Sequence, residues 1–589
     1  MEKRQLYERL DRCLANFDWR VVFPEASLTH LNQLKFEAAW LTHDEFPELI
    51  QREWKANESW NQKVGHIKKY LLEWNLNTFG NAFKAKKQLL RRLNGITGKL
   101  MQGPNRFLER LQSELWTELE SILAREEIIW FQKSRCKWLL MGDRNTRYFH
   151  GTIVIRRRRN KVERLLNDQA LWVTQQEELE AMVTEPISDE EILQAIKRMG
   201  SFKAPGPDGL QAIFYQSQWN VVGPFVCKLI HDIEEQPSKV AHINDTLIVI
   251  IAKVEVVTHL KQMRPISLCN VSYKLLTKVL AHRLSKVMEY LVHPNQSSFV
   301  PHRNSRDNVI VFQEVMHSMK SKKGNKGWMA IKIDLEKAYD RLNWNFIKDT
   351  LLDIGLPSSF INLVWACISS AKFRMLWNGE ALSEFLPSRG VRQGDPISPY
   401  IFVLCMERLF HLINMTIEHH IWKPICLSRS GPLISHLAFA DDLVLFAEAS
   451  TNQVEVIKAC LNTFCDSAGL KVSQEKTRIF FSNNVGHVVR NEISSVFGFQ
   501  RTNDLGKYLG IPTHHSRVNR VTYQGIIDKI NSRLSGWKEK NLSFTGRLTL
   551  TKSVLQALPS YTMQMVHLPR ALCDEVDKIC KRFLWGGWK

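Results

Sequence analysis

Two adjacent carboxylates, Asp441 and Asp442, interrupt an otherwise apolar stretch that runs from residue 437 to residue 446. An apolar–turn–apolar pattern predicts a tight hairpin with largely buried strands. Two neighbouring anions at such a turn disfavour each other's ionised form, and partial burial raises the pKa of both. A divalent cation offsets that cost, because oxygen ligands suit a hard metal. The pair therefore indicates half of a Mg²⁺ site, although a solvated turn is the commoner setting for an isolated Asp-Asp pair.

A third carboxylate, Asp334, follows a short segment in which Ile331 and Ile333 alternate with polar neighbours. This spacing predicts a strand that delivers Asp334 at its end. The next segment, 344–352, has apolar residues at helical spacing. Two-metal phosphoryl transfer requires carboxylates that converge on cations about 4 Å apart. Folding that brings Asp334 to Asp441 would complete such a site, and the spacing alone does not prove that it does.

A loop rich in glycine and proline, residues 387–399, lies between these two segments. Glycine lets a backbone approach another polymer closely, and Arg392 and Gln393 carry groups that hydrogen-bond to phosphates or base edges. The apolar run 400–409 predicts a helix buried behind the loop. An ordinary surface loop is the alternative interpretation and the commoner use of such sequence.

The three segments occur in the order of motifs A, B and C of one family of polymerases. Asp334 with residues 337–340, the block 392–396 and the block 439–442 resemble those motifs in the reverse transcriptases of non-LTR (LINE-type) retrotransposons, with plant-like features. Further blocks resemble the family's fingers, its motif D and its primer-side motif E: residues 203–209, 264–270, 294–300, 469–476 and 508–512. The resemblance extends from about residue 130 to the end of the sequence.

The resemblance implies roles for the acidic and aromatic residues. Asp334, Asp441 and Asp442 match the family's acidic triad. Asp334 and Asp441, with the backbone carbonyl of Leu335, would hold two Mg²⁺ ions. Tyr339, five residues after Asp334, matches the aromatic residue that excludes a 2′-hydroxyl and so selects deoxynucleotides.

Basic and loop positions complete the nucleotide site that the resemblance implies. Arg264 and Lys253 match fingers residues that reach the triphosphate, and Gln393 and Gly394 match the loop that touches template and nucleotide. Taken as isolated residues, a core aromatic for Tyr339 and a surface charge for Arg264 are the commoner interpretations.

The composition favours a polyanionic partner. In 589 residues, 80 lysines and arginines against 60 aspartates and glutamates give a net charge of +20. The basic run 156–161 indicates phosphate contact and also fits a nuclear import signal, so an intracellular, nuclear protein is expected. Eleven cysteines without a Cys-x-x-Cys pair favour reduced thiols over disulfides or a zinc module. No uncharged apolar run reaches the roughly 18 residues of a transmembrane helix, so no membrane partner is expected.

The fold class expected is α+β, a polymerase right hand of fingers, palm and thumb with antiparallel palm strands backed by helices. Residues 8–30 resemble only the end of the endonuclease domain that precedes the polymerase in these elements, so most of that domain is expected to be missing. Four regions are predicted: a helical N-terminal region with this remnant (1–129), a basic connector (130–185), fingers and palm (186–515) and a helical thumb (516–589). Apolar residues at helical spacing predict the helices of the two terminal regions: Phe107, Leu108, Leu111, Leu115 and Leu119 in the first, and Ile526, Ile527, Ile530, Leu534 and Trp537 on one face in the last.

Two departures from the family leave more than one function open. Segment 172–187 is shorter than in relatives, and His302 replaces a glycine, which strains the backbone if φ is positive there. The first candidate is an RNA-directed DNA polymerase that extends a DNA primer on an RNA template with dNTPs. The alternative is a non-catalytic retrotransposon relic that at most binds RNA. A third candidate, an RNA polymerase or a splicing-associated relative, conflicts with Tyr339. No oligomeric state is predicted.

Overall fold

The computed structural model of the protein describes most of the chain. The residues described are 36–54, 59–79, 82–100, 105–134, 185–253, 257–259, 262–377, 380–427, 431–513, 520–535 and 543–585. The endonuclease-like residues 8–30, the basic run 156–161 and nearly all of segment 172–187 lie outside them.

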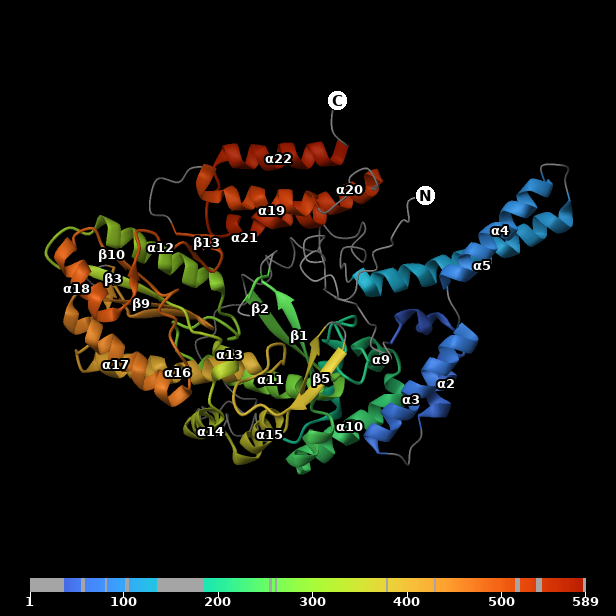
Figure 1. Ribbon diagram of the computed structural model, residues 1–589, viewed down its shortest axis with the longest axis horizontal. Helices are drawn as coiled ribbons and strands as arrows, with labels where there is room; N and C mark the ends of the chain where they lie inside the picture. Colours follow the sequence, from blue (N-terminus) through green and yellow to red (C-terminus); the bar gives the residue numbers. More distant parts are fainter. Residues whose placement is uncertain are drawn as a thin grey trace, which may run out of the picture.

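A five-stranded sheet carries the predicted carboxylates (Figure 1). In spatial order its strands are β11 (Gln500–Arg501), β10 (Arg478–Phe481), β3 (Trp328–Ile333), β9 (Asp442–Glu448) and β8 (His436–Phe439). β3 pairs antiparallel with both β9 and β10, and β8 pairs antiparallel with β9, whereas the short β11 runs parallel to β10. The predicted palm of antiparallel strands is confirmed.

Both faces of this sheet are covered, which explains why β9 is apolar along most of its length. Leu443 and Leu445 pack into the main core, whereas Val444 and Phe446 pack into a second core on the opposite face. Helices on the first face are α11 (Val271–Leu291), α14 (Trp344–Asp353), α16 (Ser398–Glu418), α17 (Thr451–Ala468) and α18 (His487–Phe497). The second face is covered by α12 (Ser305–Ser321) and by the hairpin of β12 (Lys507–Tyr508) and β13 (Ile511–Pro512).

The helices predicted after Asp334 and after the glycine–proline loop are α14 and α16. In the described part of the chain, α16 alone is long and apolar enough to cross a membrane. Its apolar residues, including Phe402 and Phe410, are buried in the main core. The apolar composition of α16 is therefore explained by packing behind the palm sheet.

The four strands of a second sheet come from segments before and after the palm strand β3 in the sequence. Its order is β2 (Met263–Cys269), β1 (Asp245–Ala252), β4 (Lys372–Trp377) and β5 (Glu380–Phe385), with β1 antiparallel to β2 and parallel to β4. The surrounding helices are α8 (Asp189–Lys197), α9 (Ala212–Ser217), α10 (Trp219–Glu235), η4 (Pro237–His242), α13 (Ala338–Arg341) and α15 (Ser358–Ser369). A small hairpin, β6 (Ile425–Cys426) with β7 (Leu433–Ile434), lies before β8.

The N-terminal region is helical, as predicted. Its elements are η1 (Ala38–Thr42), α2 (Phe46–Glu53), α3 (Trp60–Trp74), η2 (Asn75–Phe79), α4 (Ala82–Leu100) and α5 (Arg106–Ser134). Phe36 and Trp54 contact Phe214 of α9, with ring centroids 5.5 and 6.1 Å apart, so residues 36–74 share the core of the second sheet's helices. Helices α4 and α5 form a hairpin that projects from the body (Figure 1).

The C-terminal region is helical as well and has its own core. Its elements are η6 (Arg520–Tyr523), α19 (Gln524–Ser535), α20 (Phe544–Leu550), η8 (Thr551–Leu555), α21 (Ala557–Met563) and α22 (Arg570–Trp585). The predicted apolar face of α19 is confirmed, because Ile526, Ile527 and Ile530 are buried against Leu572 and Phe583 of α22.

Candidate active site

Strand pairing brings the three predicted carboxylates to one end of the palm sheet. Ile333, the last residue of β3, pairs with Leu443 of β9. Asp334 directly follows β3, and Asp442 is the first residue of β9, so both lie at the same end of the sheet. Asp441 lies in the turn of the predicted hairpin, which Phe439 and Asp442 close as a pair.

Three buried polar side chains fix this hairpin, and the sequence interpretation did not identify them. Ala440, which precedes Asp441, has a φ of 55°. Its backbone N–H donates to Ser298 Oγ at 2.7 Å and to Gln296 Oε1 at 3.2 Å. Asn308 Nδ2 donates to the Ala438 carbonyl at 2.7 Å. Because a non-glycine residue rarely adopts positive φ, these bonds hold the acidic turn in a conformation that it would not take alone.

The sequence contained one clue to this support. Gln296 and Ser298 belong to the block 294–300 that resembles the family's fingers, yet both are completely buried, as is Asn308. Polar side chains are seldom buried without a hydrogen-bonding task. Burial itself, however, depends on contacts with the hairpin more than a hundred residues later, and spacing does not reveal such contacts.

The environment of Asp442 agrees with the expectation for paired carboxylates. Its side chain is exposed on one side, but desolvation by the surrounding protein raises its pKa above the ordinary value. The charges of Asp441 and Asp334 raise that pKa further, and Lys332 opposes them. The three carboxylates therefore interact electrostatically at this end of the sheet.

Asp334 is held by the segment that resembles motif D. Its carboxylate Oδ2 lies 3.5 Å from Lys476 Nζ, and its backbone N–H donates to Thr477 Oγ1 at 3.3 Å. Leu335 forms a bridge with Val472, but residues on either side make the two hydrogen bonds of that bridge. The Leu335 carbonyl, the third predicted metal ligand, is therefore not used in this pairing.

The donors at this end of the sheet suit a hard divalent cation in their chemistry. In the described residues, no group of three or more His, Cys, Asp or Glu side chains is close enough to form a ready-made metal site. The Lys476 ammonium instead supplies the positive charge beside Asp334. A metal bound through Asp334 would have to replace this ion pair.

Tyr339 lies next to the carboxylates with its ring fixed. The ring stacks on Phe402 of α16, with centroids 4.6 Å apart and planes 15° apart. Burial, together with the negative charge of Asp441, raises the pKa of Tyr339 to about 12. The phenol is therefore neutral at physiological pH, and its position is set by packing.

The glycine–proline loop is fastened to the segment around Tyr339. Val391 N–H donates to the Tyr339 carbonyl at 2.7 Å. Gly390 has a φ of 84°, and a Cβ at this position would lie 2.6 Å from the Asp340 carbonyl oxygen, so only glycine fits. Gln393 bridges two parts of the molecule, because its Nε2 donates to Asp340 Oδ1 at 3.4 Å and its carbonyl accepts from Ser267 N–H of β2 at 3.1 Å. Gly394, next to it, is exposed.

The prediction that Arg392 contacts phosphates or bases is wrong. Its side chain is buried under the loop. The guanidinium donates to Tyr273 OH, to the Asn244 side chain and to the Cys367 carbonyl, the last at 2.7 Å, and it lies 3.6 Å from Asp395. Residue type and a loop setting suggested exposure, but this arginine joins the loop to the helices and strands behind it.

The two predicted basic residues belong to the β1–β2 hairpin, and both are exposed. Lys253 follows β1, and its charge lowers the pKa of Asp340, which burial raises overall. Lys253 is thus near the Asp340–Gln393 pair. Arg264 lies opposite Ile251 in the hairpin, and no contact between it and the palm carboxylates occurs in the described structure.

The expectation for His302 is confirmed, because its φ is 64°. The following Arg303 donates to the carbonyls of His293 at 2.6 Å, Val292 at 2.8 Å and Gln296 at 2.9 Å. The strained position therefore lies beside the block that supports the acidic hairpin.

The chain is similar in sequence to known proteins over part of its length. The family described as "Reverse transcriptase (RNA-dependent DNA polymerase)" matches residues 251–513. The transposon TX1 149 kDa protein of Xenopus laevis is 24% identical over 408 residues, which cover 68% of this chain and 30% of that protein. The Pol polyprotein of the type-2 retrotransposable element R2DM of Drosophila melanogaster is 30% identical over 280 residues, covering 47% and 25%.

Two further comparisons are shorter or weaker. A mitochondrial protein of Arabidopsis thaliana is 48% identical over 65 residues, covering 11% of this chain and 53% of that protein. The structure of apo telomerase from Candida tropicalis aligns over 42% of this chain and 51% of that chain, with 16% identity and a TM-score of 0.30, which is too low to bear on the fold.

The chain spans between a quarter and a third of the length of its transposon and retrotransposon relatives. The matched segment contains Asp334, Asp441 and Asp442 as well as the loop that holds Gln393. Residues 251–513 therefore form a reverse transcriptase domain, and the chain is similar to the proteins of the non-LTR retrotransposons TX1 and R2.

Proposed function

We propose that this protein is an RNA-directed DNA polymerase that extends the 3′-hydroxyl of a DNA primer on an RNA template, with dNTPs as substrates. The observation that carries the proposal is the pairing of Ile333 with Leu443, which delivers Asp334 and the Asp441–Asp442 pair to one end of the palm sheet. Carboxylates gathered from two motifs at one sheet end are what metal-assisted nucleotidyl transfer requires.

Reverse transcriptases use divalent metal ions, and two Mg²⁺ ions are proposed here. Asp334, Asp441 and the Leu335 carbonyl would hold them. When bound, such ions activate an attacking hydroxyl and neutralise the charge of the departing pyrophosphate. The protein's own contribution is to bring the carboxylates together and to offer Lys476 as an exchangeable partner for Asp334.

The incoming nucleotide is assigned to the space between Tyr339 and the β1–β2 hairpin. The stacked ring of Tyr339 offers a rigid wall against a 2′-hydroxyl. Gln393 and Gly394 face template and nucleotide from the loop, and Lys253 and Arg264 reach the triphosphate. In this proposal residues 186–515 act as fingers and palm, and residues 516–589 act as a thumb that grips the template–primer duplex.

Primer extension with purified protein, an annealed RNA template and DNA primer, Mg²⁺ and dNTPs tests the proposal. Asp441→Asn should abolish extension and leave template–primer affinity nearly unchanged, because phosphate contacts come from lysine and arginine. Asp349→Asn, on the exposed surface of α14, is the matched control and should extend like the unaltered protein. Full extension by Asp441→Asn would refute the assignment.

The relic alternative has a different signature in the same experiment. A folded protein that binds the template–primer but adds no nucleotide would be a non-catalytic RNA-binding relic. A cooperative unfolding transition, measured alongside, shows that the protein tested is folded.

A further inference from the structure

The end of the palm sheet opposite to the carboxylates is basic. Strand β3 has six residues, so its first residue, Trp328, lies about 20 Å from Asp334. Residues 320–327, which comprise the end of α12 and the loop that leads into β3, contain four lysines and no acidic residue. Lys323 and Lys326 are exposed, and Lys322 lies 5.7 Å from the centre of the Trp328 ring.

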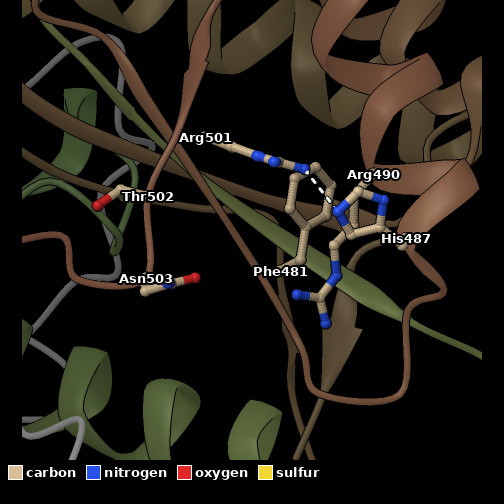
Figure 2. A pocket seen from close by; sticks show the side chains of 6 residues that line it. All are labelled: Phe481, His487, Arg490, Arg501, Thr502 and Asn503. Atoms are coloured by element: carbon tan, nitrogen blue, oxygen red, sulfur yellow. Dashed lines mark hydrogen bonds between the residues drawn. The ribbon is translucent and has the colours of Figure 1, made fainter.

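A recess lies beside this loop at the edge of the sheet (Figure 2). Its volume is about 280 Å³, and its walls come from β10, α18, β11 and the residues after β11. The lining residues are Phe481, His487, Arg490, Arg501, Thr502 and Asn503, none of which is acidic. Figure 2 shows the two guanidinium groups on either side of the Phe481 ring.

Both arginines are held in place by neutral partners. Arg490 donates to the carbonyls of Val485 and Ser482 at 2.9 and 3.0 Å. Arg501 Nη1 donates to Asn491 Oδ1 at 2.7 Å. Arg501 Nη1 also contacts His487 Nε2 at 3.4 Å (Figure 2). In the described structure neither guanidinium group pairs with a carboxylate. Their charge is therefore uncompensated, and their orientation is fixed before any ligand arrives.

The turn after β10 joins the lysine loop to the recess. Asn484 Nδ2 donates to the carbonyls of Gly324 and Lys326 at 2.8 and 2.7 Å. The adjacent Asn483 carbonyl accepts from Arg490 at 3.3 Å. The loop and the recess therefore form one continuous surface, which we call the basic rim: Lys322, Lys323, Lys326, Arg490 and Arg501.

We propose that the basic rim binds the sugar–phosphate backbone of a nucleic-acid strand that runs outside the polymerase cleft. The inference rests on the proposed function, which supplies a long nucleic-acid partner. The recess lies on the face of the sheet opposite to the primer-side hairpin, because Phe481 packs into the main core with α18, whereas Tyr508 of the β12–β13 hairpin packs on the other face.

A polymer fits the rim better than a small anion does. The recess is smaller than the pockets that enclose drug-sized ligands, and His487, Arg501 and Asn503 at its mouth are exposed. The cations continue from the recess into the lysine loop, so one phosphate would satisfy only part of them. The bidentate guanidinium groups of arginines, together with lysines spaced along a surface, can bind successive phosphates of one strand.

Binding measured by fluorescence anisotropy tests the inference. Two labelled template–primers are compared: one whose RNA template extends only a few nucleotides beyond the primer, called the short substrate, and one whose RNA template continues as a long single strand. The variant Lys323→Gln/Lys326→Gln/Arg501→Gln removes three exposed charges of the rim. Lys69→Gln/Lys197→Gln/Lys228→Gln removes three exposed charges elsewhere and is the matched control. Each variant's unfolding transition is recorded to confirm folding.

The rim variant should lose affinity for the extended template–primer on the order of tenfold at physiological salt. The slope of log K against log [salt] should fall by about 2, since each single-strand phosphate contact contributes about 0.7. Affinity for the short template–primer and the rate of primer extension on it should not change. The control variant should show a smaller loss, equal for the two substrates.

Three results would overturn the inference. The first is unchanged affinity and slope in the rim variant. The second is no gain in affinity of the unaltered protein when the long single strand is added, a result that leaves extension on the short substrate, and so the proposed function, intact. The third is displacement of the extended strand from the rim by inorganic pyrophosphate at low millimolar concentration, which would assign the recess to a small anion. A DNA extension that binds as the RNA extension does supports backbone recognition.

Discussion

At one end of strand β3, three carboxylates lie together; at the other end, lysines and arginines gather around a recess. The charges of Asp441 and Asp334 help to raise the pKa of Asp442, which desolvation raises most, and Lys476 pairs with Asp334. Arg490 and Arg501, in contrast, are held by neutral carbonyl and amide oxygens. The same sheet thus has one acidic end and one basic end.

The two ends also differ in how their backbone is supported. The acidic hairpin depends on side chains from distant segments, namely Gln296, Ser298 and Asn308. At the basic end, Arg490 binds carbonyls only five to eight residues earlier, although Asn484 also ties this end to the lysine loop. Long-range support makes the acidic hairpin sensitive to remote changes, whereas local support makes the position of Arg490 less sensitive to them.

The largest effect is expected from removing that long-range support. Asn308→Ala should lower the free energy of unfolding by about 1–3 kcal/mol, because the buried Ala438 carbonyl and Ser297 hydroxyl lose a partner. It should also lower kcat for extension by roughly 10- to 100-fold through displacement of the acidic turn, with little change in KM for dNTPs.

Chemical denaturation and steady-state extension measure both effects. Asn345→Ala, at an exposed position of α14, is the matched control. A kcat that stays normal in a destabilised Asn308→Ala would show that the hairpin needs no distant support, and the contrast between the two ends would fail.

An intermediate effect is expected from the anchored arginine at the basic end. Arg490→Met should lower the free energy of unfolding by about 1–3 kcal/mol, because three carbonyls lose their donor. Arg501→Met, at an exposed position, should change it by less than about 0.5 kcal/mol. Urea unfolding compares the two variants, and equal losses would mean that Arg501 is as much a structural residue as Arg490.

The smallest effect concerns pH at the acidic end. Since the pKa of Asp442 is raised in the folded protein, its ionisation costs stability as the pH rises from the ordinary carboxyl value through the folded one. Asp442→Asn should therefore raise the melting temperature slightly at neutral pH and match the unaltered protein at acid pH, below the ordinary value. An increase in melting temperature that is the same at all pH values would indicate a cause other than the charge of Asp442.

Much of the catalytic end was predictable from sequence because its signals are local. An apolar run broken by Asp441 and Asp442 identifies a hairpin, and an alternating segment before Asp334 identifies a strand end. The spacing of Ile526, Ile527 and Ile530 likewise predicted the buried face of α19. Such patterns depend on residues that are neighbours in the chain, so they can be recognised without knowledge of tertiary contacts.

The incorrect predictions concern residues whose environment is set by contacts between distant parts of the chain. Arg392 has the residue type and the loop setting of a ligand-binding group, yet it is buried by helices that come from other parts of the chain. Phe107 was assigned to an apolar face of the N-terminal helices but is 72% exposed, because its position on α5 faces away from α4. The basic rim went unnoticed because its lysines and arginines are spread over some 180 residues and meet only in the folded palm.

The core shared by residues 36–74 and α9 has a consequence for synthesis of the protein. Phe36 and Trp54 cannot complete their packing until Phe214 has been synthesised, 140 residues after Trp74. At about 5–20 residues per second, a ribosome needs roughly 10–30 s to supply it. During that interval the tryptophan-rich surface of the nascent chain is exposed to solvent. Chaperones that bind such surfaces would then determine the yield of folded protein.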